Sequence, residues 1–284
     1  MNILITGSNG QLGNCIQELQ HLYPQHQWFN TDVEQLDITK PEQIRQYVGE
    51  NQIDGIVNCA AYTAVDRAED NEELATLLNA EAPAYLAHAI AQRNGWFIQI
   101  STDYVFDGKA HQPYNEEHPT NPQSVYGKTK LVGEFNALKF CQRTVIIRTA
   151  WLYSAYGHNF VKTMMNLGRQ KEQISVVADQ HGTPTSAHDL AGVIMQIIEQ
   201  GIIPGTYHYT NLGQTTWYAF ASQIMADAQI NCKVLPITTE QYPTPAQRPA
   251  YSVLDKTKIQ QVYHLNIPQW EDSLKTIIMK LEQQ

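Results

Sequence analysis

The chain has 284 residues, of which 43% are hydrophobic and 17% charged, and 19 basic against 28 acidic residues leave a formal net charge of −9. This balance is typical of a folded globular protein with a substantial core rather than of a disordered chain. The acidic excess argues against a nucleic-acid partner, and no apolar run approaches the roughly 20 residues that span a bilayer.

The first residues and the cysteines indicate a cellular location. The chain reaches Gly7 with no basic lead and no long apolar core, so no secretory signal is expected. Its four cysteines are widely separated, without a C-x-x-C pair or a histidine at ligand spacing. We therefore predict reduced thiols, no metal site, a cytoplasmic protein, and neither a membrane nor a nucleic acid as partner.

The first half of the chain alternates short apolar runs with amphipathic segments. Strands are expected at residues 2–6, 27–31, 54–61, 96–102 and 144–153. Helices are expected just after residue 10, from residue 39, and near residues 74–93 and 125–140. Strands that are apolar throughout are buried on both faces, and their alternation with helices predicts an α/β fold with a doubly wound parallel sheet, the Rossmann architecture.

Beyond residue 153 the alternation is less regular. Helices are expected near residues 160–170, 188–200, 217–228 and 270–281, and strands near 174–178 and 206–209. We predict a dinucleotide-binding domain at residues 1–168, to whose sheet residues 184–210 return. Residues 169–183 and 211–284 are expected to form a smaller C-terminal substrate lobe within the same compact body.

Three glycines, Gly7, Gly10 and Gly13, lie between the first strand and the first helix in the pattern T-G-x-x-G-x-x-G. The first permits a tight turn, the second lets the main chain approach a pyrophosphate, and the third allows close packing of helix on sheet. The helix N-terminus adds free N–H groups and a positive dipole end. Spaced glycines alone are weak evidence, but this position after a strand and before a helix predicts dinucleotide binding.

Two acidic residues compete for the adenosine end of the cofactor. Asp32 lies 19 residues after Gly13, close to where a carboxylate binds the ribose hydroxyls, which favours NADH. Asp37, followed by Ile38, is the alternative, near the adenine. No arginine directly follows the second strand, where it could contact the 2′-phosphate of NADPH. The sequence is nevertheless compatible with either NADH or NADPH as cofactor.

Tyr126 and Lys130 are four residues apart on one expected helix, so their side chains emerge from one face. This helix follows the strand that ends at Thr102, at the carboxyl edge where an open parallel sheet binds ligands. Reduction of a ketone needs a hydride on carbon and a proton on oxygen. A nearby ammonium lowers the pKa of a tyrosine, and a threonine hydroxyl polarises a carbonyl. We predict Tyr126 as proton donor, with Lys130 and Thr102 as its catalytic partners.

These motifs resemble the extended short-chain dehydrogenase/reductase superfamily, and longer strings narrow the resemblance to the dTDP-4-dehydrorhamnose reductase family. The strings are N-C-A-A-Y-T-A-V-D at residues 58–66, S-T-D-Y-V-F-D-G at 101–108, Y-G-K-T-K-L at 126–131, R-T-A-W at 148–151 and D-Q-x-G-x-P-T at 179–185. The resemblance implies reduction by NADPH or NADH of the C4 ketone of dTDP-6-deoxy-L-lyxo-4-hexulose to dTDP-L-rhamnose. It also implies a homodimer, sometimes with magnesium, for which no ligands are placed here.

The resemblance assigns further site residues. Besides Tyr126 and Lys130, it implies cofactor contacts from Gly7, Gly10, Gln11, Leu12, Gly13, Asp32, Asp37, Ile38, Ala61, Tyr62 and Thr63. The sugar nucleotide would contact Thr102, Asp103, Trp151, Val65, Tyr104 and Arg248. The planar fork of an arginine suits a diphosphate. Trp151 also fits an ordinary core residue at a strand end, and Asp103 a residue that braces a loop.

Two other functions remain open on the same scaffold. One is a nucleotide-sugar epimerase or dehydratase, which retains its cofactor and returns the hydride to the substrate. The short chain and the string at residues 101–108 argue against it. The other is a non-catalytic NADP-binding regulatory subunit, as in relatives that bind methionine adenosyltransferase. The presence of Tyr126, Lys130 and Thr102 argues against this second alternative.

Overall fold

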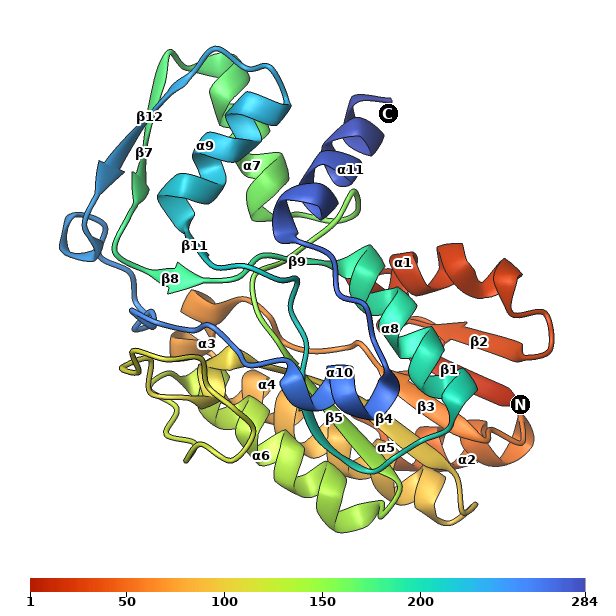
Figure 1. The fold of residues 1–284 in the computed structure, drawn as a ribbon. Helices are drawn as coiled ribbons and strands as arrows, with labels where there is room; N and C mark the ends of the chain where they lie inside the picture. The colour runs from red at the N-terminus through yellow and green to blue at the C-terminus, as the bar shows by residue number, and fades with distance from the viewer. Residues whose placement is uncertain (284) are drawn as a thin grey trace.

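Six parallel strands form the central sheet of the computed structural model, which describes residues 1–283 (Figure 1). In spatial order they are β10 (Gly205–His208), β5 (Thr144–Thr149), β4 (Trp96–Thr102), β3 (Gly55–Asn58), β1 (Asn2–Thr6) and β2 (Gln27–Thr31). The chain moves outward from β1 in both directions, so the strand order reverses between β1 and β3. In such sheets ligands bind beyond the carboxyl ends of the strands at that reversal.

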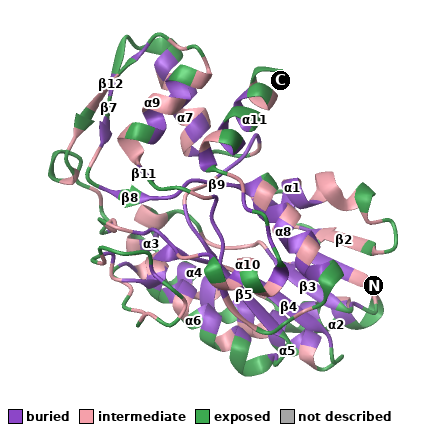
Figure 2. Cartoon of the chain, in the orientation of Figure 1, coloured by how far each residue is buried: buried purple, intermediate pink, exposed green. Residues whose placement is uncertain are grey.

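Helices cover both faces of the sheet. One face carries α1 (Gln11–Leu19), α8 (Ala187–Gln200) and α10 (Thr257–Tyr263), and the other carries α2 (Pro41–Glu50), α5 (Ala82–Ala91) and α6 (Val125–Phe140). Ile3 and Ile5 of β1 join the first core cluster, whereas Leu4 joins the second. The strand is apolar throughout because alternate residues face two different cores. The predicted doubly wound Rossmann fold is confirmed, and Figure 2 shows the sheet buried at its centre.

A second, smaller group of elements lies at the top of Figure 1. It contains α7 (Phe160–Gln170), α9 (Trp217–Asp227) and α11 (Trp270–Glu282), with the parallel pair β7 (Gln173–Val177) and β12 (Lys233–Ile237). The core of this group is formed by apolar side chains such as Met165, Phe220 and Leu274.

The remaining elements are short. They are η1 (Gln20–Leu22), α3 (Val65–Asp70), α4 (Glu72–Thr76), η2 (Leu77–Glu81), η3 (Asp103–Val105), β6 (Leu152–Tyr153), β8 (His181–Gly182), β9 (Thr185–Ser186), β11 (Thr215–Thr216) and η4 (Thr239–Gln241). Of these, α3 and η3 come after the carboxyl ends of β3 and β4, at the edge of the sheet where ligands bind.

Three expected elements differ from the structure. The strand expected at residues 54–61 is β3, which ends at Asn58. The helix expected near residues 74–93 is divided into α4, the π-helical turn η2 and α5, and Pro83 lies in the first turn of α5, where its missing N–H is tolerated. The strand expected to run to residue 153 ends at Thr149, because Trp151 takes a left-handed φ of +48° that a strand cannot contain. After this break, β6 pairs with β9 instead of β4.

The packing of α7 and α10 bears on the expected domain boundaries. Residues of α7 such as Met164 pack with α9 rather than with the main sheet, whereas Ile259 and Tyr263 of α10 belong to the main core. Strand β10 pairs with β5 in the central sheet. We therefore propose that the smaller lobe begins near residue 154 rather than at 169, and that α10 belongs to the dinucleotide-binding domain.

The buried side-chain amide of Asn211 forms hydrogen bonds with both groups of elements, so its removal should destabilise the protein. Asn211 accepts from the Ser186 amide at 2.8 Å and donates to Asp189 at 2.7 Å and to Ser273 of α11 at 3.0 Å. Asn211→Ala should lower the free energy of unfolding by about 3 kcal/mol, because it leaves buried polar groups without partners. Urea denaturation measures this change.

The control is Asn71→Ala, which removes an exposed amide that contacts only the Arg67 carbonyl. This change should cost less than about 0.5 kcal/mol. Equal losses of unfolding free energy in Asn211→Ala and Asn71→Ala would contradict the stabilising role of the Asn211 hydrogen bonds.

Candidate active site

The glycine turn connects β1 to α1 in a conformation that side chains would block. Gly7 has a left-handed φ of +64°, and a Cβ there would lie 2.6 Å from the Ala60 nitrogen. A Cβ at Gly13 would lie 2.5 Å from the Gly7 carbonyl oxygen. Gly10 is less confined, since its Cβ would meet only the same oxygen, at 3.2 Å. Gly7 and Gly13 therefore shape the turn, and Gly10 leaves space above it.

The N-terminus of α1 is uncapped. Within residues 1–283, no side chain caps it at Gly10, and no acidic residue occupies its first turn. The amides of Gln11, Leu12 and Gly13 stand in that first turn, where N–H groups have no partner within the helix. Free amides and the positive end of the helix dipole suit an anion, so this turn fits the pyrophosphate of a dinucleotide.

The side chain of Gln11 turns toward the smaller lobe. Its Oε1 accepts hydrogen bonds from Ser154 at 3.1 Å and from the Nδ2 of Asn159, the N-cap of α7, at 3.0 Å. The side-chain oxygen of Gln11 is therefore committed to the smaller lobe, and its backbone amide stays in the first turn of α1. Sequence analysis did not predict this contact between the lobes, because Gln11 and Asn159 are 148 residues apart.

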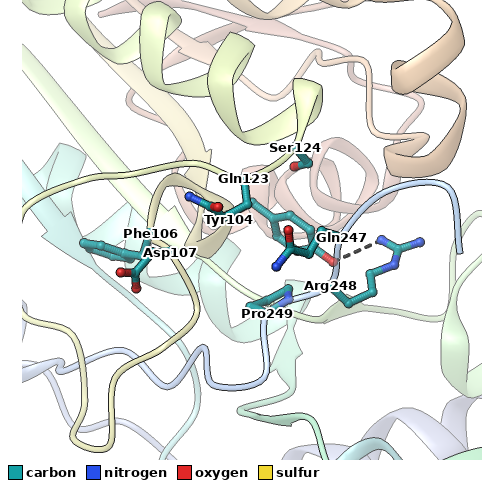
Figure 3. Close-up of a pocket in the computed structure, with 8 residues that line it drawn as sticks. All are labelled: Tyr104, Phe106, Asp107, Gln123, Ser124, Gln247, Arg248 and Pro249. Carbon is teal, nitrogen blue, oxygen red and sulfur yellow. Dashed lines mark hydrogen bonds between the residues drawn. The ribbon is translucent and has the colours of Figure 1, made fainter. Parts of the chain in front are cut away.

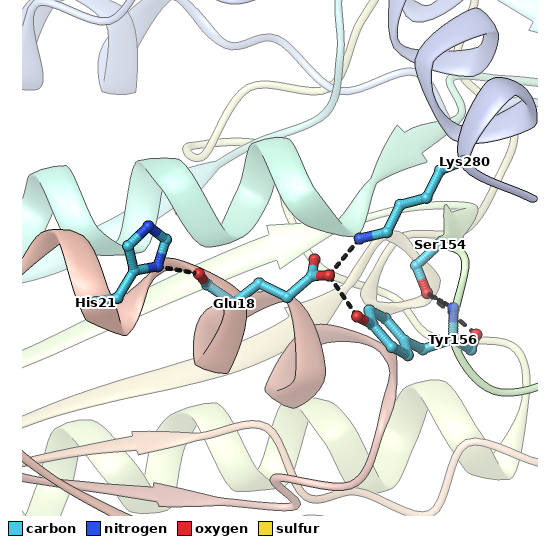
Figure 4. Close-up of polar contacts among 5 residues, drawn as sticks. All are labelled: Glu18, His21, Ser154, Tyr156 and Lys280. Atoms are coloured by element: carbon cyan, nitrogen blue, oxygen red, sulfur yellow. Dashed lines mark hydrogen bonds and ion pairs between the residues drawn. The ribbon is translucent and has the colours of Figure 1, made fainter. Parts of the chain in front are cut away.

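A second tie joins α1 to the smaller lobe (Figure 4). Glu18 of α1 accepts from Lys280 of α11 and from the Tyr156 hydroxyl, which follows β6. Lys280 also lies over the Tyr156 ring, 5.1 Å from its centroid. The helix that carries the glycine turn is thus held against the smaller lobe at both ends.

The two candidate acids have different surroundings. The Asp32 carboxylate accepts from the Asn9 amide of the glycine turn at 3.1 Å and from the Val33 amide at 2.8 Å. Asp37 accepts from the amide and hydroxyl of Thr39, and these bonds lower the pKa of its carboxyl. Asp32 therefore adjoins the phosphate turn, whereas Asp37 closes a local turn beside the buried Ile38.

The segment Ala61, Tyr62 and Thr63 lies after β3, next to the glycine turn. Buried Asn79 fixes it, because its Oδ1 accepts from the Tyr62 amide at 2.8 Å and its Nδ2 donates to the Tyr62 carbonyl at 3.1 Å. The same Nδ2 lies 3.2 Å from Thr129 of α6. Asn79 thus connects a candidate cofactor wall to the helix of Tyr126. No local pattern in the sequence identifies it.

The structure brings the three candidate catalytic residues together. Tyr126 and Lys130 lie on the face of α6 that packs on the sheet, and Lys130 is buried, with its Nζ donating to the Ile100 carbonyl of β4 at 2.6 Å. Thr102 ends β4, donates to Asp103 at 2.9 Å and lies next to the Tyr126 side chain.

Burial moves the pKa of both ionisable groups of this cluster. It raises the pKa of Tyr126 well above its usual value, and the contact with Thr102 opposes part of this change. Burial lowers the pKa of Lys130 to about 8, while the charge of Glu134 acts in the opposite direction. At neutral pH the phenol is therefore protonated and the amine is an ammonium, which are the states that a proton donor and its electrostatic partner need.

Two of the candidate substrate residues, Tyr104 and Arg248, line a small pocket (Figure 3). Arg248 donates to the Tyr104 hydroxyl at 3.0 Å and to Asp66 of α3 at 2.6 Å. The Tyr104 ring contacts that of Tyr126 edge-on, with centroids 5.5 Å apart. A continuous path of side-chain contacts therefore leads from the Arg248 guanidinium through Tyr104 to Tyr126, the candidate proton donor.

Asp103 is buried beside this path. Its Oδ2 has no hydrogen-bond partner among residues 1–283, and burial raises its pKa to about 6. An orphaned carboxylate oxygen of this kind is available to a substrate hydroxyl.

Trp151 and Val65 are not among the residues that line this pocket. Trp151 stacks on Trp217 of α9, with ring centroids 3.6 Å apart, and holds a left-handed φ that is rare for a bulky residue. Its indole also fills the space next to Gly182. Val65 is the half-buried first residue of α3, next to Asp66.

Metal and membrane features are absent from the part of the chain that the structure describes. Residues 1–283 contain no cluster of three or more histidine, cysteine or acidic side chains that could bind a metal ion, and their four cysteines are free thiols. None of their helices has the length and apolar character needed to cross a bilayer.

A glycine turn that suits a pyrophosphate and a tyrosine–lysine pair lie at one edge of a doubly wound sheet, which is an arrangement expected of a Rossmann-fold NAD(P)H-dependent oxidoreductase, and the chain is an enzyme of that class. Residues 1–283 match the RmlD substrate binding domain family. The chain belongs to this family.

Individual relatives agree with this assignment. A dTDP-4-dehydrorhamnose reductase from Aggregatibacter actinomycetemcomitans is 39% identical over 97% of both chains. The crystal structure of one from Clostridium acetobutylicum is 45% identical, with a TM-score of 0.96 over 99% of this chain and 100% of that chain. The Bacillus anthracis dTDP-4-dehydrorhamnose reductase, crystallised in complex with NADP, is 40% identical, with a TM-score of 0.94 over 98% and 99%.

The different confinement of two glycines gives a test of the phosphate turn. Gly10→Val should keep the fold but raise the dissociation constant for NADPH about tenfold or more, because its side chain would occupy the space that a pyrophosphate needs. Fluorescence titration with NADPH measures the affinity, and thermal unfolding measures the fold.

Gly13→Ala is the matched comparison. It should lower the unfolding temperature, because its Cβ would lie 2.5 Å from the Gly7 oxygen. Unchanged NADPH affinity in folded Gly10→Val would contradict the assignment of the turn.

Proposed function

We propose that the chain reduces the C4 ketone of dTDP-6-deoxy-L-lyxo-4-hexulose to dTDP-L-rhamnose, with NADPH or NADH as hydride donor and Tyr126 as proton donor. The observation that carries this proposal is the placement of Tyr126 beside Thr102 and above buried Lys130, at the carboxyl edge of the sheet. The names of the relatives support the choice of substrate.

The residues divide the reaction among them. A bound nicotinamide supplies the hydride that reaches C4 of the sugar. The Tyr126 hydroxyl gives its proton to the oxygen that becomes the new hydroxyl, and the ammonium of Lys130 stabilises the phenolate that remains. Thr102 polarises the carbonyl before transfer. Burial favours proton transfer from Tyr126 to the substrate, because it raises the pKa of the phenol and keeps it protonated until the substrate oxygen becomes basic.

The diphosphate end of the substrate would lie beside Arg248, and the sugar end would lie beside Tyr126. The guanidinium suits the diphosphate, for which it would exchange part of its contact with Asp66. Asp103 and Trp151 would contact the sugar, together with Tyr104 and Val65. The cofactor would lie across the glycine turn, with Asp32 near its ribose and residues 61–63 along its length.

Removal of the phenol hydroxyl tests the proton donor. Tyr126→Phe should lower kcat by about 100-fold or more, the usual size of a general-acid contribution. The dissociation constant for NADPH should stay within about twofold of that of the unchanged protein, since the ring remains. Full turnover by Tyr126→Phe would contradict the assigned role.

The pKa of Lys130 predicts a pH dependence. Because this pKa is lowered to about 8 in the free protein, the ammonium is lost as the pH rises through that value. The kcat/KM for NADPH, which reports the free enzyme, should fall about tenfold for each pH unit above that pKa. A profile that stays flat to pH 9.5 would contradict the need for a charged Lys130.

The identity of the reaction is tested by stoichiometry. The protein should oxidise one added NADPH or NADH for each dTDP-4-keto sugar reduced, and NMR should identify the product as dTDP-L-rhamnose. An epimerase or dehydratase would consume no added cofactor, because it returns the hydride. A regulatory subunit would bind the cofactor and leave the sugar nucleotide unchanged.

A further inference from the structure

A carboxylate lies buried one helical turn beyond the candidate catalytic lysine. Glu134 follows Lys130 by four residues on α6, and both face the sheet, with relative exposures of 2% and 4%. Neither the phosphate turn nor the path to Arg248 involves Glu134. Buried carboxylates are rare unless a partner compensates them, so this one requires an explanation.

Two neighbouring strands hold the Glu134 carboxylate. Arg148 of β5 donates to it through Nε at 2.9 Å and through Nη2 at 2.7 Å, which is the bidentate geometry of a strong pair. Ser101 of β4 donates its hydroxyl to Oε1. Ser101 and Arg148 are register partners in the sheet, so the carboxylate lies over the point where the two strands meet.

Other groups around Arg148 leave this pairing undisturbed. The guanidinium lies over the Phe106 ring, 5.1 Å from its centroid. Burial and the charge of Arg148 lower the pKa of nearby His208 to about 3, so this imidazole is neutral at physiological pH. Among residues 1–283, Arg148–Glu134 is the ion pair in which both side chains are less than one-tenth exposed.

Stability alone does not account for such a pair. The desolvation of two buried charges offsets most of their attraction, and neutral side chains of similar volume are often equally stable. The position next to Lys130 gives a functional reason. The Lys130 ammonium donates its described hydrogen bond to a neutral group, the Ile100 carbonyl. The negative charge of Glu134 therefore offsets part of the cost of burying the positive charge of Lys130.

We propose that Glu134 is a positioning residue that keeps Lys130 in its ammonium form, and that Arg148 and Ser101 fix its carboxylate for this purpose. The proposal rests on the function proposed above. Glu134 touches neither substrate nor cofactor in this scheme. It acts through Lys130, whose ammonium in turn stabilises the Tyr126 phenolate.

Few other ionisable groups face Lys130 from the elements packed around it. The segment after β3 contributes the Cys59 thiol, which burial keeps protonated by raising its pKa to about 12. Asp103 at the end of β4 acts on Tyr126, and Glu69 of α3 binds the Val125 amide at the N-terminus of α6. The remaining charged group is Arg148 of β5, which is bound to the Glu134 carboxylate. Glu134 is therefore the anion whose removal should alter Lys130.

A matched pair of variants tests the proposal. Glu134→Gln removes the charge and keeps the size, whereas Glu134→Asp keeps the charge and shortens the side chain. In protein labelled with ¹³C-lysine, the Cε resonance of Lys130 reports its titration without substrate or cofactor, and Lys130→Met assigns the signal. The pKa of Lys130 should fall by about one unit or more in Glu134→Gln and by less than half as much in Glu134→Asp.

The pH profile of kcat/KM for NADPH is the second readout. Its basic limb should move to lower pH in Glu134→Gln by the same amount as the NMR titration. A merely structural role would lower the rate in both variants at every pH and leave the limb in place. An unchanged Lys130 titration in Glu134→Gln would overturn the proposal.

A double variant covers failure to fold, since Glu134→Gln leaves the guanidinium of Arg148 buried and unpaired. Glu134→Gln combined with Arg148→Met removes both charges, and its Lys130 should titrate at lower pH than Lys130 in Arg148→Met, which retains the carboxylate. Equal titration of Lys130 in these two variants would overturn the proposal. The NMR result is independent of the reaction, so a protein that reduces no sugar nucleotide would refute the proposed function and leave this test intact.

Discussion

Lys130 lies between α6 and β4, with its ammonium hydrogen-bonded to the Ile100 carbonyl and almost fully removed from water. Removal of this charge from water costs free energy, so the groups around Lys130 have to compensate its charge. The helix must lie close to the ends of β4 and β5, and compensation must come from within the protein. The same placement brings Tyr126 to Thr102 at the rim of the sheet.

The parallel sheet explains why several candidate site residues lie together at this edge. The carboxyl ends of β1, β3 and β4 carry the glycine turn, the segment at residues 61–63 and Thr102 on neighbouring strands. Side chains beyond the strand ends are free to face a ligand, whereas those within the strands are committed to the two cores. The smaller lobe contacts this rim where Trp217 of α9 stacks on Trp151, and Arg248 contacts it through Asp66 of α3.

Contacts between the lobes converge on α1. Gln11 at its start and Glu18 near its end both bind residues of the smaller lobe. The helix whose free amides fit a pyrophosphate is therefore also the helix on which that lobe rests.

Local patterns in the sequence determined the Rossmann fold, the glycine turn and the shared face of Tyr126 and Lys130, because strand and helix periods and fixed spacings along one element encode these features. The tertiary structure alone decided which residues support them. Asn79, the Arg148–Glu134 pair and the Arg248–Asp66 contact, 182 residues apart, join separate elements, and the break at Trp151 depends on its stacking with α9. Such partners meet only after the chain has packed, so no spacing in the sequence records them.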